Sequence, residues 1–462
     1  MCTALPGQDG VRRERPTRNG GSVSDQQTPE RSNAGSRLPR EIWILAAGSF
    51  IVAVGMGIVS PALPAFAASF DVGVTLISFV ISAFAFMRLA FAPVSGRLVS
   101  RFGERPIYVW GIAIVGLSTA ACAFAESYWQ LLVFRALGGT GSTMFTVSAI
   151  ALLVRLAPPD RRGRASGVWA TSFLLGNISG PIVGGVMVGY SLRLPFVSYA
   201  VALFLAAFVG WIMLRKSTLA ARAEDDGSPA MTVREALGHL SYRAVLLSNF
   251  SLGWGVFGVR MALLPLFVVE VVRTTEGMAG VALSVFAAGN AAVLMVAGKL
   301  SDQYGRKPMI LAGLAVTAVA TIGLGYTTTV PLMLTASLFS GVGAGLMNPA
   351  QSAAVADVIG SKARGGTVLA TFQMAADVGA IVGPLIAGAL ADAISFEAAF
   401  LATGMTAVIA LAVWVFAPET MAKREPEGDE HTCQDLAPEV GHLDDAPEVP
   451  NTERIAGNRS ET

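Results

Sequence analysis

Four ionisable side chains lie deep inside long apolar stretches of the sequence: Arg88, Arg135, Arg260 and Asp377. Charge is costly in hydrocarbon, so such residues face protein or water and have a partner or a function. Asp377 lies about 16 Å from the start of its stretch by helical rise, near the middle of a bilayer. Burial favours the neutral form of a carboxyl group, and a nearby guanidinium favours the charged form. Asp377 is therefore predicted to take up and release protons, unless it forms a static ion pair.

Three arginines against one aspartate leave a net positive interior, which also fits the binding of an anion. Arg135 and Arg260 could hold such an anion through bidentate contacts, and Arg88 is a third candidate. Aromatic residues suit a bulky lipophilic ligand instead; those in two of the stretches are Trp169, Phe173, Phe250, Trp254 and Phe257. Uncharged candidates for ligand contact are Asn249, Asn290, Asn348 and Gln373.

Several other kinds of chemistry are not expected. The cysteines (Cys2, Cys122, Cys433) and histidines (His239, His431, His442) lack the spacing of a disulfide framework or a metal site. The segment G-x-x-x-x-G-K-[ST], which would bind a nucleotide phosphate, is missing from the sequence. The apolar stretches contain no histidine and no evident acid–base pair. We therefore predict no metal, no cofactor and no enzymatic activity.

The elements that must position these residues are long apolar helices. Of the 462 residues, 53% are hydrophobic and 14% charged, and the net charge of +1 does not suggest a nucleic-acid partner. Each of twelve apolar runs is about long enough to cross a bilayer. Their approximate limits are 42–66, 74–95, 107–125, 129–153, 165–189, 194–214, 244–269, 278–297, 308–326, 331–356, 366–390 and 396–416. The predicted fold class is an all-α integral membrane protein in contact with the lipid bilayer.

Lysine and arginine are distributed very unevenly between the two sides of these runs. The two tails and alternate loops hold 28 of the 33, the other loops hold two, and three lie inside the runs. Cytoplasmic loops of membrane proteins carry the excess of Lys and Arg. We therefore expect a multi-pass protein of the plasma (inner) membrane with both termini in the cytoplasm.

The sequence contains an internal repeat. The segment GRLVSRFGERP (96–106) aligns with GKLSDQYGRKP (298–308), and GPIVGG (180–185) aligns with GPLIAG (383–388). The two alignments have nearly the same offset, which indicates a duplicated six-helix unit. The predicted organisation is a disordered tail (1–41), a six-helix bundle (42–214), a cytoplasmic linker (215–243), a second six-helix bundle (244–418) and a disordered acidic tail (419–462). Two such halves with a site between them at the midplane are typical of transporters.

Three motifs add detail. In the 96–106 segment, Gly96 allows two helix ends to approach closely and Gly103 allows a tight turn. An arginine and a glycine cluster follow in Leu131-x-x-x-Arg135-x-x-Gly138-Gly139-x-Gly141. The third motif, Gly176-x-x-x-Gly180-Pro181-x-x-Gly184-Gly185, predicts a closely packed, bent helix. Generic helix packing is the alternative interpretation of that glycine spacing.

With these motifs, residues 42–418 resemble the major facilitator superfamily, and the third motif is similar to that of its twelve-span drug:proton antiporters. The resemblance implies a role for Arg135 in proton coupling. It also implies that a carboxylate in the first motif holds one conformer. Ser100 replaces that carboxylate in the first copy, while Asp302 retains it in the second, so we expect the conformational latch in the second half. The motif positions are Gly96, Arg97, Arg101, Gly103, Gly298, Asp302, Gly305, Arg306 and Lys307.

The function expected from sequence is proton-coupled efflux of small, partly lipophilic compounds by a monomer. An exchanger of organic anions or metabolites is the alternative within transport. A non-transporting receptor or membrane scaffold is the alternative outside it. Buried charges between two glycine ridges favour transport.

Overall fold

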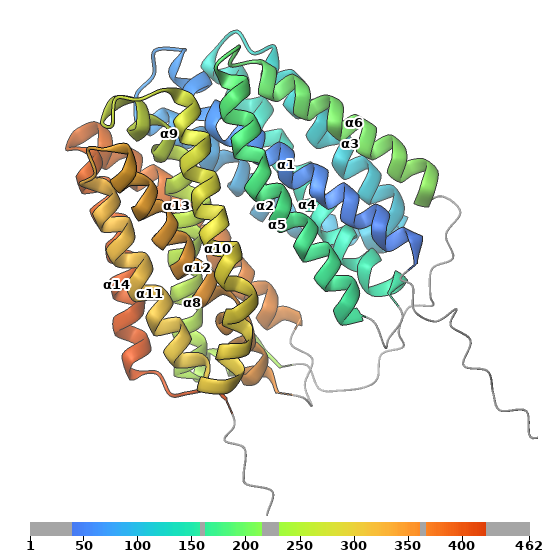
Figure 1. The fold of residues 1–462 in the computed structure, drawn as a ribbon. Helices are drawn as coiled ribbons and strands as arrows, with labels where there is room; N and C mark the ends of the chain where they lie inside the picture. The colour runs from blue at the N-terminus through green and yellow to red at the C-terminus, as the bar shows by residue number, and fades with distance from the viewer. Residues whose placement is uncertain (1–38, 158–161, 215–230, 361–365, 422–462) are drawn as a thin grey trace, which may run out of the picture.

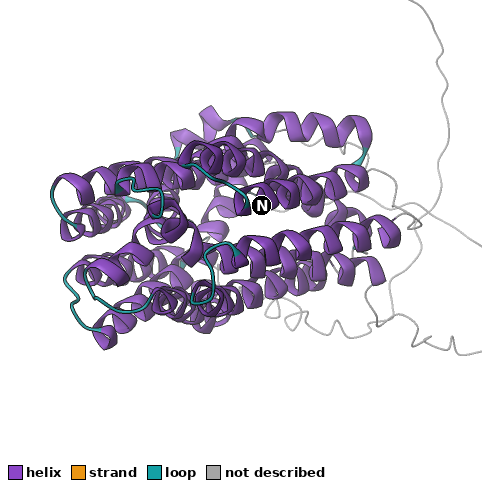
Figure 2. Cartoon of the chain, turned by 90° about the horizontal axis from the view of Figure 1, so that it is seen from above, coloured by secondary structure: helices purple, strands orange, loops and turns teal. Residues whose placement is uncertain are grey.

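The computed structural model describes residues 39–157, 162–214, 231–360 and 366–421, and these form helices joined by short loops (Figures 1 and 2). Within these residues, twelve helices are long and apolar enough to cross a membrane. The protein is therefore an all-α, multi-pass membrane protein, as the sequence predicted. The predicted tails beyond residues 39 and 421, and residues 215–230 of the predicted linker, lie outside the described part.

Six helices form the N-terminal half and the remainder form the C-terminal half. The first half contains α1 (Arg40–Ala68), α2 (Val74–Phe102), α3 (Glu104–Ala123), α4 (Tyr128–Leu156), α5 (Arg162–Val188) and α6 (Leu194–Leu214). The second contains α7 (Val233–Gly238), α8 (Leu240–Leu252), the π-helix η3 (Gly253–Val259), α9 (Arg260–Glu270), α10 (Glu276–Tyr304), α11 (Arg306–Gly325), α12 (Val330–Ile359), α13 (Gly366–Ala393) and α14 (Phe396–Phe416).

The seventh span is built from three of these pieces. It runs without a break from α8 through η3 to α9, and it starts at Leu240 rather than at residue 244 as expected. Gly253, Gly255 and Gly258 fall in η3. A π-helical segment in a long helix often marks a functional site. The short helix α7 precedes this span, and a reciprocal capping box between Thr232 and Glu235 begins it.

The repeat seen in the sequence is also present in the backbone. Gly103 and Gly305, which the repeat aligns, have φ of 86° and 102°. This conformation is readily available only to glycine and allows the tight turn between consecutive helices. Asp71 and Arg273, which are paired by the same alignment, both have φ of 55°. Equivalent turns therefore join equivalent helices in the two halves.

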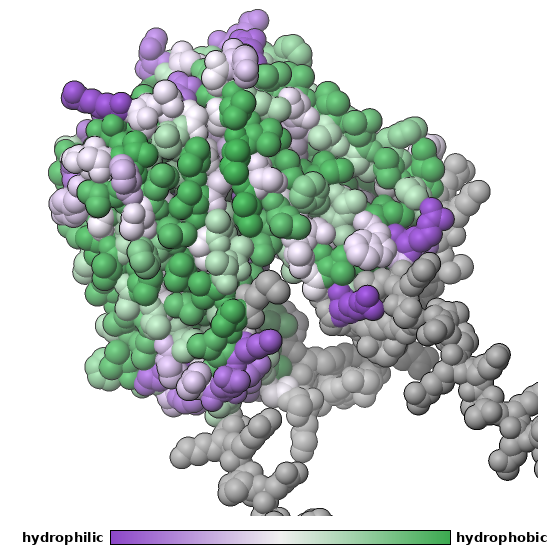
Figure 3. Space-filling model, in the orientation of Figure 1, coloured by the Kyte–Doolittle hydropathy of each residue, from purple (hydrophilic) through white to green (hydrophobic). Residues whose placement is uncertain are grey.

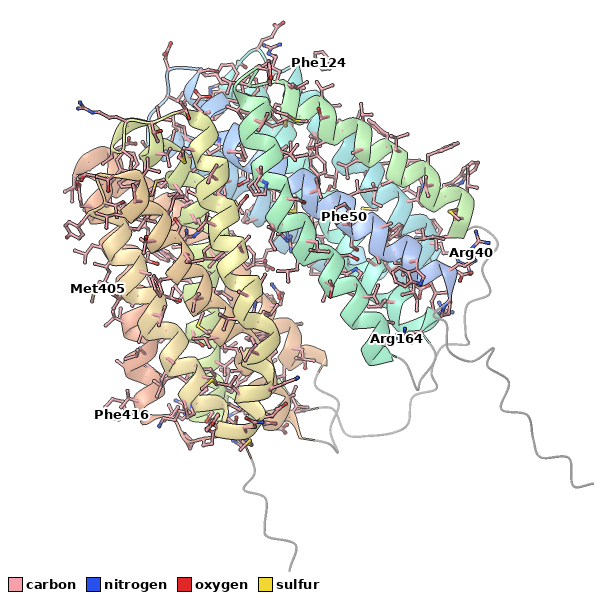
Figure 4. The ribbon with its side chains drawn as sticks, in the orientation of Figure 1. Arg40, Phe50, Phe124, Arg164, Met405 and Phe416 are labelled. Carbon is pink, nitrogen blue, oxygen red and sulfur yellow. The ribbon has the colours of Figure 1, made fainter. Side chains whose placement is uncertain are left out.

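The two halves touch at one end and separate at the other (Figure 1). The main contacts between them pair α2 with α13 and α5 with α10, and α1 also contacts α9. We call the end formed by loops 69–73, 124–127, 189–193, 271–275, 326–329 and 394–395 the closed end, and the opposite end the open end. Phe124 lies at the closed end, while Arg40 and Arg164 of one half and Phe416 of the other lie at the open end (Figure 4). The surface is notched between the lower ends of the halves (Figure 3).

The lateral surface of the molecule is apolar. Large hydrophobic side chains such as Phe204, Phe208, Trp211, Val319 and Phe339 are exposed around the bundle. Hydrophilic residues gather at the two ends of the molecule (Figure 3). An exposed apolar surface of this extent would aggregate in water, so it is suited to contact with lipid.

The glycine ridge of α5 packs on the backbone of α1. A Cβ added to Gly176 would lie 2.6 Å from the Ala53 Cβ and 2.9 Å from the Phe50 carbonyl oxygen. A Cβ on Gly180 or Gly184 would meet the backbone around Val54 or Ile58 in the same way. Helix backbones this close require glycine at the contact. The ridge therefore joins two helices of the same half, next to Pro181, which lies within α5.

The repeat of this ridge in α13 packs on the seventh span. A Cβ on Gly379 would lie 2.7 Å from the Trp254 backbone nitrogen, and one on Gly383 would lie 2.8 Å from the Trp254 ring. A Cβ on Gly258 would lie 2.7 Å from the Pro384 ring. The packing of the fifth span on the first is thus equivalent to the packing of the eleventh span on the seventh.

We predict that Gly184→Ala destabilises the protein by about 1–3 kcal/mol, because the new methyl group must push α1 away from α5. Gly167→Ala, on the same helix, is the matched control, since no atom lies within 4 Å of its added Cβ. Thermal unfolding of the purified protein measures both. Equal melting temperatures for the two variants would contradict the close contact.

Candidate functional site

The candidate site is an ion pair between the halves. Arg88, at the middle of α2, lies 4.0 Å from Asp377 of α13, measured from the Arg Nη2 to the Asp Oδ1. The side chains are 28% and 20% exposed, so both remain accessible to a small ligand or water. Gln373, one turn earlier on α13, lies beside the Asp377 carboxyl group. The structure therefore brings together three of the residues that the sequence singled out.

This pair lies where the halves begin to separate. Nearer the closed end, the Ser82 hydroxyl donates to the Ile381 carbonyl oxygen at 2.7 Å across the same pair of helices. Beyond Arg88, α2 and α13 continue toward the open end, where the halves diverge (Figure 1). A ligand or proton that reaches a charge pair at the apex of such an opening changes the attraction between the two halves.

Arg135 and Arg260 each lie inside one half, over an aromatic ring. The Arg135 guanidinium lies 4.2 Å from the Phe84 ring centre, and that of Arg260 lies 4.1 Å from the Phe286 ring centre. Phe84 and Phe286 are repeat partners, by the alignment that pairs Gly103 with Gly305. The two arginines are not equivalent, because Arg135 is in the fourth span and Arg260 in the seventh. The structure does not bring them together, and so gives no geometry for a shared anion clamp.

The surroundings of these two arginines differ. Arg260 is only 4% exposed, and its Nη2 donates to the Ser340 hydroxyl at 2.6 Å. Arg135 borders a cavity of about 10 Å³ inside the N-terminal half, together with Ser142 and Tyr199. A space of this size holds at most about one water molecule. Arg260 is thus enclosed by its own half, and the cavity beside Arg135 is too small for an organic substrate.

The other polar candidates are held within the C-terminal half. The Asn249 amide donates to the Phe372 carbonyl oxygen at 2.6 Å, and the Trp254 indole donates to the Thr403 hydroxyl at 3.3 Å. Both side chains are buried and join the seventh span to its neighbours. Asn290 and Asn348 are half-buried, on α10 and α12. Asn249 and Trp254 therefore hold helices together in the present conformer.

The motif at the open end of α10 belongs to a charge network in the C-terminal half. Arg306 pairs with Asp302 one turn away, and its Nε lies 3.2 Å from the Asp357 carboxylate at the end of α12. The Lys307 ammonium donates to the carbonyl oxygens of Val415 and Ala417 at 2.8 Å. The network therefore joins α10, α11, α12 and α14.

Glu419 completes this network by capping α11. It accepts hydrogen bonds from the backbone N–H groups of Arg306 and Lys307 at 2.9 and 3.0 Å. Burial alone would raise the pKa of Glu419, but these two N–H groups and those of Thr420 and Met421 hold the pKa below its ordinary value. The hydrogen bonds thus favour the charged form of the carboxyl group.

The N-terminal half has the same arrangement with its charges exchanged. In the alignment of Gly103 with Gly305, Glu104 occupies the position of Arg306, and Arg155 occupies the position of Asp357. The Arg155 Nη1 lies 2.6 Å from the Glu104 carboxylate. Ser100, at the position of Asp302, donates to the Gly96 carbonyl oxygen of its own helix at 3.0 Å. The exchanged pair therefore replaces the Arg306–Asp357 contact, and Ser100 makes no contact like that of Asp302.

The sequence did not single out several residues that make polar contacts between the halves, among them Ser82 and Asp392. Asp392 at the closed end of α13 hydrogen-bonds to the first residues of α2. A signal for it was available, because Gly388-Ala-Leu-Ala-Asp392 has the same Gly-x-Leu-x-Asp spacing as Gly298–Asp302. Ser82 carries no comparable signal. The described residues contain no group of three potential metal ligands.

Known proteins resemble this chain at the levels of family, sequence and structure. The model of the Major Facilitator Superfamily matches residues 45–275 and 245–453. A multi-drug resistance efflux pump PmrA homolog of Lactococcus lactis subsp. lactis (strain IL1403) is 26% identical, over 82% of this chain and 94% of the relative. Multidrug resistance protein 2 of Bacillus subtilis (strain 168) is 24% identical, over 84% and 96%.

A solved structure shares the fold. It is a bacterial homolog of the human lysosomal transporter Spinster in an inward-facing, unoccupied conformation. The TM-score is 0.68 at 17% sequence identity, over 81% of this chain and 95% of that chain. The similarity establishes a common architecture of the helices.

We predict that the exchanged ion pair of the N-terminal half can be inverted. Glu104→Arg alone places two arginines together and should destabilise the protein by about 1–3 kcal/mol. The double variant Glu104→Arg with Arg155→Asp copies the C-terminal half and should recover most of that loss. Thermal unfolding measures the recovery. A double variant no more stable than Glu104→Arg would show that the two side chains do not interact as a pair.

Proposed function

The chain belongs to the Major Facilitator Superfamily, and we propose that it is a secondary active transporter that exports small, partly lipophilic compounds in exchange for protons. Relatives named as multidrug efflux pumps match it at about a quarter identity over nearly their whole length. The observation that carries the proposal is the Arg88–Asp377 pair between the halves. We infer that one chain suffices for transport, because both halves of the site belong to it.

The proposed orientation places the open end in the cytoplasm. The loops of the open end and both tails contain 28 of the 33 Lys and Arg residues, and cytoplasmic loops carry this excess. The present conformer would therefore open inward, with both termini in the cytoplasm of a cell whose plasma membrane contains the protein. Substrate would reach the site from the cytoplasm, as efflux requires.

Asp377 is the proposed proton carrier. In the inward-open conformer its carboxylate faces Arg88, which favours the charged form after its proton has been released. Protonation from outside would remove that charge and release Arg88. The halves could then change their relative position without separating two charges, and the proton would be carried to the cytoplasmic side.

The glycine ridges give the proposed motion a mechanical basis. Each ridge joins two spans of one half, α5 with α1 and α13 with η3, through backbone contacts that leave little room for deformation. Closely packed elements move as rigid bodies rather than bending continuously. Each half would therefore rock as a unit about the contacts near Ser82 and Ile381.

The geometry favours this proposal over exchange of organic anions. A clamp built from Arg135 and Arg260 would need both guanidinium groups to face a common space. Each instead lies against a phenylalanine ring inside its own half. Arg88 is the arginine nearest the candidate site, and it is already paired with Asp377.

We predict that Asp377→Asn abolishes transport driven by a pH gradient and preserves exchange of labelled for unlabelled substrate. The amide keeps the shape of the side chain and cannot carry a proton. Ethidium in proteoliposomes, with an imposed pH gradient, tests the first property, and counterflow tests the second. Glu397→Gln, a half-buried acid at the start of α14, is the control. Unchanged pH-driven uptake by the Asn variant would contradict the role of Asp377.

A further inference from the structure

The closed end is held by a carboxylate that crosses from one half to the other. Asp392 of α13 accepts hydrogen bonds from the backbone N–H groups of Val74 and Thr75 at 2.9 and 2.7 Å. It also accepts one from the Thr75 hydroxyl at 2.5 Å. Val74 and Thr75 begin α2, and the N-cap residue Gly73 provides no side-chain hydrogen bond. The start of α2 thus receives its cap from the opposite half.

A carboxylate is well suited to this place. The first N–H groups of a helix have no partner within the helix, and they carry the positive end of its dipole. Hydrogen bonds to a charged acceptor are about twice as strong as neutral ones. The cap exists only while α13 lies against α2, so its energy contributes to the closed end and not to either half alone.

Gly388, one turn before Asp392, lets the two helices approach. A Cβ added there would lie 3.0 Å from the Ser78 Cβ and 3.1 Å from the Val74 carbonyl oxygen. A Cβ added to Gly73 would likewise lie 3.0 Å from the Asp392 carboxylate. Small residues on both sides therefore bring the carboxylate within reach of the helix start.

The same Gly-x-Leu-x-Asp spacing occurs at both ends of the molecule, and only the copy at the closed end contacts the opposite half. At the closed end, Gly388 and Asp392 contact the opposite half. At the open end, Gly298 has no atom within 4 Å of an added Cβ, and the Asp302 side chain is 70% exposed. The engaged copy is thus the one on the side where the halves meet.

We propose that Gly388 and Asp392 form the latch that keeps the closed end shut, with Asp392 as a positioning residue that sets the ratio of the two conformers. The proposal rests on the proposed function only because the conformers are taken to be those of a transport cycle. Breaking the latch opens the closed end without altering the substrate site near Asp377.

The latch is present on one side of the molecule only. The equivalent contact pairs α5 with α10, where an added Cβ on Gly185 would lie 2.6 Å from the Gly277 carbonyl oxygen. In the alignment of Gly180 with Gly383, Gly189 stands at the position of Asp392. The start of α10 instead has its own acid, Glu276. Glu276→Gln is therefore the matched control, since it removes an acid from a helix start without removing a bond between the halves.

The test measures the conformers directly. The full chain, carrying Cys2→Ser and Cys433→Ser, is spin-labelled at Glu126→Cys and Thr328→Cys, which lie in equivalent loops of the closed end. Cys122 is buried and can stay. Distances are measured in proteoliposomes for the parent and for Asp392→Ala, Asp392→Asn, Thr75→Val, Thr75→Ser and Glu276→Gln. Thermal unfolding of each variant is recorded alongside.

Asp392→Ala should increase the long-distance population relative to the short one by roughly 5- to 30-fold. Asp392→Asn, which keeps an acceptor, should have a smaller effect. Thr75→Val should shift the ratio slightly, Thr75→Ser should keep the parent ratio, and the melting temperatures should stay close to that of the parent. An Asp392→Ala distribution equal to that of the parent or of Glu276→Gln would overturn the proposal. A shift with no detectable transport would preserve the latch and count against the proposed function.

Discussion

The structure depends on keeping one acid and one arginine, from different halves, in contact at the middle of an apolar bundle. Arg88 and Asp377 are costly in hydrocarbon as single charges, and pairing offsets part of that cost. Because the pair spans the boundary between the halves, its protonation state and the relative position of the halves are linked. The hydrogen bonds of Asn249 and Arg260, in contrast, stay within the C-terminal half and do not depend on how the halves are arranged.

Much of the architecture could be predicted from sequence because bilayers impose simple rules. Twelve apolar runs, the asymmetry of Lys and Arg, and repeats at a nearly constant offset were sufficient for the number of spans and the six-plus-six division. The family model confirmed the family resemblance. The π-helical segment in the seventh span was not predictable, because Gly253, Gly255 and Gly258 allow several backbone forms and only packing against α13 selects one.

The candidate site was predictable in part. The depth of Asp377 indicated its importance, but which arginine it faces depends on how the two halves dock. Trp254 and Asn249 were expected to contact a ligand, because aromatic and amide side chains suit ligand contact. Residue type alone does not show which way a side chain points, and both hydrogen-bond within their own half. The exchanged pair Glu104–Arg155 explains why the first motif departs from its second copy: Glu104 stands where the copy has Arg306, and the reversal at Arg155 compensates.

A pH titration of the conformers tests the role of the Arg88–Asp377 pair most directly. Spin labels at Phe102→Cys and Tyr304→Cys, both exposed at the open end, report its width in proteoliposomes. In the parent, acidification should protonate Asp377, weaken its attraction to Arg88 and reduce the open-end population along a curve for one proton. In Asp377→Asn the population should no longer follow that curve. An identical titration in the variant would show that the proton acts elsewhere.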